Sequence, residues 1–64
     1  MADVPEGALL LTIPEAAARL RLSRSTLYVL VQRGELPVVK VGKAVRVPLA
    51  ALAEWVRRHT APAA

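Results

Sequence analysis

Two helix N-cap candidates, Thr12 and Ser23, follow each other so closely that the chain must turn sharply between two short helices. Glu15 stands three residues after Thr12 and completes a capping box, which marks the start of the first helix. Small and apolar residues then recur at helical spacing: Ile13, Ala16, Ala17 and Leu20. The second helix begins at Ser23 and ends at Gly34, because glycine adopts the left-handed conformation at a helix end most easily.

The second helix has two distinct sides. Its apolar side carries Leu27, Leu30 and Val31. The opposite side carries a different set of residues: Ser25, Tyr28, Val29 and Gln32. Two helices joined by so short a turn match the helix-turn-helix arrangement, and an ordinary helical hairpin within a bundle fits the spacing equally well. The spacing alone leaves both arrangements open.

The length of 64 residues allows only one hydrophobic core, and the absence of cysteine excludes disulfides and thiolate zinc sites. We therefore expect one domain over residues 9–59, with flexible segments at 1–8 and 60–64. The longest apolar run, just before Thr12, is too short for a membrane span or the core of a signal peptide. These features lead us to expect a cytoplasmic protein without a membrane partner.

The stretch 36–48 changes from helical to alternating periodicity and predicts a β-hairpin around Gly42. A loop of two residues, 42–43, would place the preceding valines on the same face as Arg46. A loop of three residues, 42–44, pairs like with like: Val41 with Val45, Val39 with Val47, and Lys40 with Arg46. We expect this second register, because it keeps charge off the apolar face. The turn type stays open, because three-residue loops favour glycine at the end rather than at the start.

A third helix is expected over residues 48–59, opened by Pro48. Its inward positions are Leu49, Leu52 and Val56. Residues 9–11 allow two interpretations, since Leu11 could pack across the first helix cap or the run could add a short strand beside the hairpin. The expected fold is therefore a small α+β domain made of two helices, a β-hairpin and a C-terminal helix.

The charge distribution favours a polyanionic partner. The formal net charge is +4, and all nine Lys and Arg residues lie between Thr12 and Thr60, where the only acidic residues are Glu15, Glu35 and Glu54. The single histidine, His59, stands at the end of the last expected helix, where a solvated side chain is the simplest interpretation. Because no nucleophile, base and orienting group come together, we expect no catalysis, metal, cofactor or small-molecule substrate.

Several short motifs stand in a fixed order along the chain: the paired Ala16 and Ala17, "LSRSTLY", "GELP", "KVGK", the "RV" that follows it, and "LAEWV". With these motifs, residues 11–56 resemble the excisionase-type winged helix-turn-helix domain, which is related to the DNA-binding region of MerR-type regulators. In that family the second helix enters the major groove, and the hairpin is a wing that contacts the backbone or the minor groove. The resemblance therefore implies double-stranded DNA as the partner.

Carried over by position, the resemblance implies two groups of contacts. The groove contacts would be Arg24, Ser25, Tyr28, Val29 and Gln32, with Arg33 flanking them; the wing contacts would be Lys40, Lys43 and Arg46. The implied role is to position or bend DNA for site-specific recombination, beside an integrase or a second copy of the chain. A small transcriptional regulator and a protein-interaction module on the outer side of the second helix are the alternatives.

Overall fold

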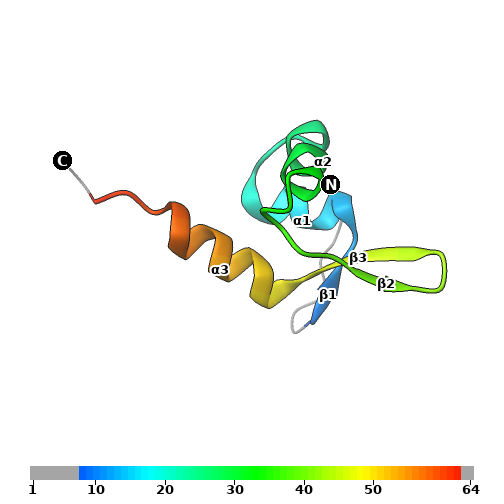
Figure 1. The fold of residues 1–64 in the computed structure, drawn as a ribbon. Coiled ribbons are helices and arrows are strands. Elements are labelled where there is room, and N and C mark those ends of the chain that lie inside the picture. The colour runs from blue at the N-terminus through cyan, green and yellow to red at the C-terminus, as the bar shows by residue number, and fades with distance from the viewer. Residues whose placement is uncertain (1–7, 63–64) are drawn as a thin grey trace.

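A computed structural model describes residues 8–62 of the chain. In order it contains β1 (Leu10–Leu11), α1 (Ile13–Leu20), α2 (Arg24–Gln32), β2 (Val39–Val41), β3 (Ala44–Pro48) and α3 (Leu49–His59). The α1–α2 pair stacks beside the sheet, the ribbon of β2 and β3 projects one way, and α3 extends the other way (Figure 1). The expected α+β winged helix-turn-helix fold is confirmed. Of the flexible ends expected from the sequence, residues 1–7 and 63–64 lie outside the described range.

Both helices of the α1–α2 pair start at the caps that the sequence indicated. The Glu15 backbone N–H donates to Thr12 Oγ1 at 3.2 Å, and the Thr12 N–H donates to Glu15 Oε1 at 2.8 Å, which completes the capping box. The Thr26 N–H donates to Ser23 Oγ at 3.2 Å at the start of α2. These bonds satisfy backbone donors that the first turn of a helix leaves without partners.

Both helices also end in the same hydrogen-bonded motif, with a different residue at its left-handed position. At the end of α2 that position is Gly34, with φ of 77°, and the Glu35 N–H donates back to Leu30 O at 2.9 Å. At the end of α1 it is Arg21, with φ of 56°, and the Leu22 N–H donates back to Ala17 O at 2.9 Å. This pattern is a Schellman motif, and glycine is its usual left-handed residue.

The sheet is antiparallel, with strand order β1-β3-β2. Leu10 pairs with Pro48 and Leu11 pairs with Val47, and both Leu11 and Val47 are fully buried. The added strand, one of the two interpretations of residues 9–11, is therefore confirmed. The short first strand closes one side of the core.

The register expected for the hairpin is wrong. Val39 pairs with Arg46 and Val41 with Ala44, so the loop has two residues, 42–43. Gly42 has φ of 61° and Lys43 has no positive φ, which is the φ pattern of a type II′ turn with glycine at its first central position. The expectation assumed that the valines must face a core, but Val39 and Val41 are 37% and 59% exposed on the projecting ribbon.

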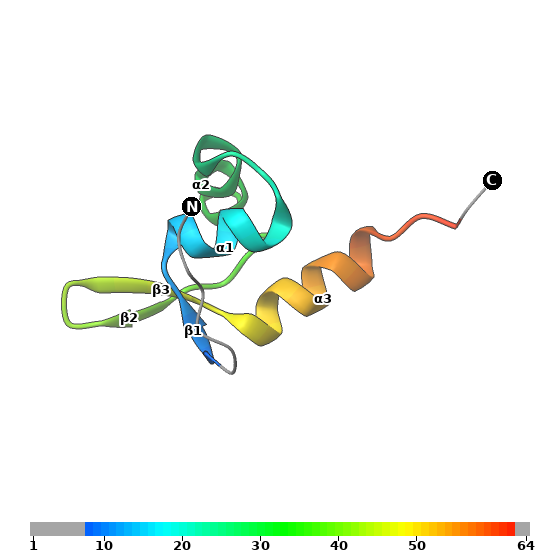
Figure 2. The same cartoon turned by 180° about the vertical axis from the view of Figure 1, so that it is seen from behind.

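The core lies where α1, α2 and the start of α3 meet the sheet. Its buried members are Leu11, Ile13, Ala16, Ala17, Leu27, Leu30, Leu36, Val47 and Leu52. The buried alanines leave room for α2 to lie close against α1. Seen from behind, the second half of α3 runs beyond the other elements (Figure 2). Val56, expected to face inward, is accordingly 45% exposed.

Candidate nucleic-acid interface

The outer side of α2 is an exposed surface, as its sequence pattern predicted. Leu27 is fully buried on the inner side, while Tyr28 and Val29 are 53% and 43% exposed on the outer side. Ser25 and Gln32 are also exposed there. A short helix with one such side free has the dimensions that a DNA major groove admits. We call these four residues, Ser25, Tyr28, Val29 and Gln32, the outer α2 face.

Arginines stand at both ends of the outer α2 face. Arg24 is the first residue of α2 and is exposed, and Arg33 is the C-terminal cap residue. Arg33 Nη1 lies 3.9 Å from Glu35 Oε2, and its side chain is 70% exposed. An ion pair this long and exposed contributes little energy, so Arg33 keeps most of its capacity to bind an anion.

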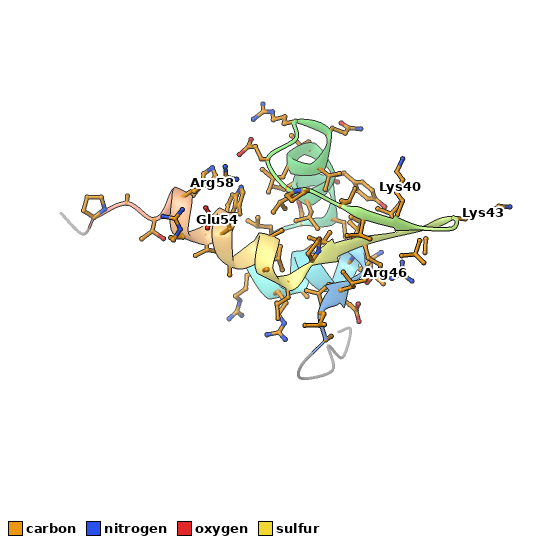
Figure 3. The ribbon with its side chains drawn as sticks, turned by 60° about the horizontal axis from the view of Figure 1, so that its bottom comes forward. Lys40, Lys43, Arg46, Glu54 and Arg58 are labelled. Carbon is orange, nitrogen blue, oxygen red and sulfur yellow. The ribbon has the colours of Figure 1, made fainter. Side chains whose placement is uncertain are left out.

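The wing cations do not share one face of the ribbon. Because Val39 lies opposite Arg46, Lys40 shares its face with Val45 and Val47, and Val47 faces the core. Figure 3 shows Lys40 and Arg46 on opposite sides of the ribbon and Lys43 at its tip. The Arg46 guanidinium donates to Val45 O at 2.9 Å, so it is also partly held by its own strand. The expectation of a single basic face is therefore wrong.

Each of the three described carboxylates has a hydrogen-bonding or charged partner. The Thr12 backbone N–H, then the Thr12 hydroxyl, lowers the pKa of Glu15, and the charge of Arg46 adds to this effect. The ion pair with Arg57 lowers the pKa of Glu54 and raises that of Arg57. Within residues 8–62, no carboxylate pairs with Arg24, Lys40 or Lys43. These three cations are available to a polyanion.

Arg21 is an exposed cation that was not among the predicted contacts. Arg21 occupies the turn between α1 and α2, two residues before the Ser23 cap. Its position in the sequence, just before the predicted start of the second helix, was the signal that could have marked it as a candidate. In residues 8–62 no three His, Asp or Glu side chains gather closely enough to hold a metal ion, and no helix there has the length and hydropathy to cross a membrane.

Two helices joined by a tight turn, followed by a β-ribbon and a third helix, define a winged helix-turn-helix domain. The family model described as a helix-turn-helix domain matches residues 10–60, and the chain belongs to that family. No solved structure matches the chain.

Sequence identity to curated relatives narrows the family further. The chain is 40% identical over 48 residues to the excisionase of Streptomyces ambofaciens, covering 75% of this chain and 77% of the relative. It is 41% identical over 49 residues to the "Probable excisionase" of Saccharopolyspora erythraea, covering 77% of this chain and 50% of the relative. A Mycobacterium tuberculosis protein that is named as a DNA-binding protein is 55% identical over 38 residues, covering 59% of this chain and 49% of the relative. The chain thus spans about half the length of the Mycobacterium and Saccharopolyspora relatives, and it belongs to the excisionase type of helix-turn-helix domain.

Proposed function

We propose that the chain binds double-stranded DNA with the outer α2 face in the major groove and the ribbon against the neighbouring backbone or minor groove. The observation that carries this proposal is the combination of an exposed helix face with cations at both its ends and on the adjacent ribbon. Arg24 and Arg33 flank the helix face, and Lys40 and Lys43 extend the positive surface along the ribbon. Arg46, on the opposite face of the ribbon, contacts a different phosphate from Lys40 if the ribbon enters a groove.

The proposed biological role is that of an excisionase, which positions or bends DNA for recombination and performs no chemistry of its own. The names of two relatives support this role. An integrase and a second copy of the chain are the protein partners we propose, because one small module covers little DNA. The cytoplasm, where bacterial DNA lies, is the proposed location.

A titration of duplex DNA at several salt concentrations tests the proposal. Phosphate contacts release counterions, so the logarithm of the affinity should fall linearly with the logarithm of salt, with a slope of about −0.9 for each contact. An interface formed by Tyr28 and Val29 with a protein would show little salt dependence. Failure to bind any duplex at low salt would overturn the proposal and leave the protein-interaction alternative.

A further inference from the structure

The end of α3 is tied to the loop between α2 and β2 through one residue, Glu35. Arg58 Nη2 donates to Glu35 O at 3.2 Å, and His59 Nε2 lies 3.2 Å from Glu35 Oε1. Every other side-chain hydrogen bond or ion pair among residues 8–62 joins residues no more than four positions apart. The Glu35 contacts are therefore the only polar side-chain links in that range between distant parts of the sequence.

The His59 ring has an oxygen acceptor at each of its two nitrogens. Nδ1 lies 2.8 Å from Trp55 O, and Nε2 lies 3.2 Å from the Glu35 carboxylate. The ring also stacks on the Trp55 indole, with centroids 4.3 Å apart and an angle of 20° between the planes. A neutral imidazole carries only one N–H, so only the imidazolium form donates to both oxygens.

We propose that Glu35 and His59 form a pH-sensitive clasp that fastens the end of α3 to the loop joining the outer α2 face to the ribbon. The clasp is complete when His59 is protonated, because both ring nitrogens then donate and the ring charge faces a carboxylate. Loss of the proton leaves one oxygen facing a nitrogen lone pair. The Arg58 bond to the Glu35 carbonyl does not involve the imidazole and remains.

Other charged side chains lie on both sides of the clasp. Arg33 lies on the loop side, 3.9 Å from Glu35 Oε2, while Arg57 and Arg58 share the end of α3 with Glu54. Because only the protonated ring donates to both oxygens, the full set of contacts exists in acidic solution and is weakened once the ring loses its proton.

The clasp has a consequence for the rest of the domain. Glu35 directly follows Gly34, which ends α2, and precedes Leu36, which is buried in the core. A firmer hold on this loop at low pH fixes the direction in which the chain leaves α2 and enters the ribbon. Within the described residues, the other polar tethers of this loop are backbone bonds to α2, from the Glu35 and Leu36 N–H groups to Leu30 O.

A double-mutant cycle on the full chain tests the clasp without DNA, so its outcome is separate from that of the proposed function. The variants are Glu35→Gln, His59→Gln and the pair together, with thermal melts at about pH 5.5 and about pH 8.5, on either side of the imidazole titration. The pair is partly exposed, so we expect a coupling between the two sites of roughly 1–4 °C in Tm at the lower pH and a smaller one at the higher pH. The cycle cancels the titration of the α-amino group, which also falls in this range.

Glu54→Gln is the matched control. Glu54 is also an exposed carboxylate paired at this end of α3, but its partner Arg57 keeps its charge at both pH values. Its effect on Tm should therefore be the same at both. A Glu35–His59 coupling that is equal at the two pH values, or absent at the lower one, would overturn the clasp.

Discussion

Val39 lies directly opposite Arg46 across the ribbon formed by β2 and β3. This single pairing sends Lys40 to the other face, so the ribbon carries a cation on each side and Lys43 at its tip. A flat contact of one ribbon face with one DNA strand would use Lys40 or Arg46, but not both. The pairing therefore makes the contributions of these two residues separable by experiment.

Replacing both Lys40 and Lys43 by alanine should weaken binding to all duplexes similarly and make the salt slope less steep by about 0.9 for each lost phosphate contact. Arg46→Ala should reduce the slope by a similar amount only if the ribbon lies between two phosphate strands. Arg57→Ala is the control for Arg46→Ala, because it removes one positive charge from α3, where Arg57 is paired with Glu54. An unchanged slope in the lysine variant would place the ribbon away from the backbone.

Gln32→Ala should change the preference among DNA sequences by about 1–3 kcal/mol at one base position, since a glutamine amide can read adenine in the major groove. Gln32 is the last residue of α2 and is exposed on its outer face. The measurement is a competition between a selected site and its single-base variants at one salt concentration. An equal loss on every sequence would mean that Gln32 contacts the backbone instead.

Arg21→Gly should raise stability by about 0.5–1 kcal/mol, because an arginine at φ of 56° carries a steric cost that glycine avoids. Gly34 already occupies the equivalent position at the end of α2. Arg19→Gly is the control, since Arg19 lies within α1, where glycine is unfavourable by about 1 kcal/mol. In denaturant unfolding, the free energy of unfolding should rise for Arg21→Gly and fall for Arg19→Gly. A lower value for Arg21→Gly than for the parent chain would refute the prediction.

Glu15→Gln should reduce the loss of stability in acid. The capping box lowers the pKa of Glu15 in the folded chain, so its contribution is present above the unfolded value, about 4.3, and is lost as the pH falls through the folded value. Glutamine keeps the geometry of the capping box but cannot titrate. Melting temperatures between about pH 6 and about pH 3 should therefore fall less steeply in the variant than in the parent chain. Equal slopes would show that Glu15 is not linked to folding.

The helices were predictable because their signals are local. Thr12, Ser23 and Gly34 each act on backbone groups within a few residues, and the structure shows all three in the expected places. The exposure of Tyr28 and Val29 followed from helical spacing for the same reason. Local hydrogen bonds and helical periodicity do not depend on how the rest of the chain packs.

The ribbon and the clasp were not predictable in the same way. The hairpin register was inferred from a rule for buried faces, whereas Val39 and Val41 lie on a projecting ribbon where turn geometry decides. The contact between Glu35 and His59 joins residues from opposite ends of the second half of the chain, and no pattern in the sequence specifies it. Neither feature has a short-range signal.

The pairing of β1 with β3 sets the shortest length of chain that can close the core. Leu10 and Leu11 pair with the last two residues of β3, and the Leu9 carbonyl accepts from the Leu49 N–H at 2.8 Å, at the start of α3, where Pro48 offers no side-chain cap. During synthesis, β1 therefore stays unpaired until its partner β3 emerges, after α1, α2 and β2. A fragment ending before residue 47 would keep the helix-turn-helix sequence but expose Leu11, so we expect α1 and α2 not to fold as a shorter peptide.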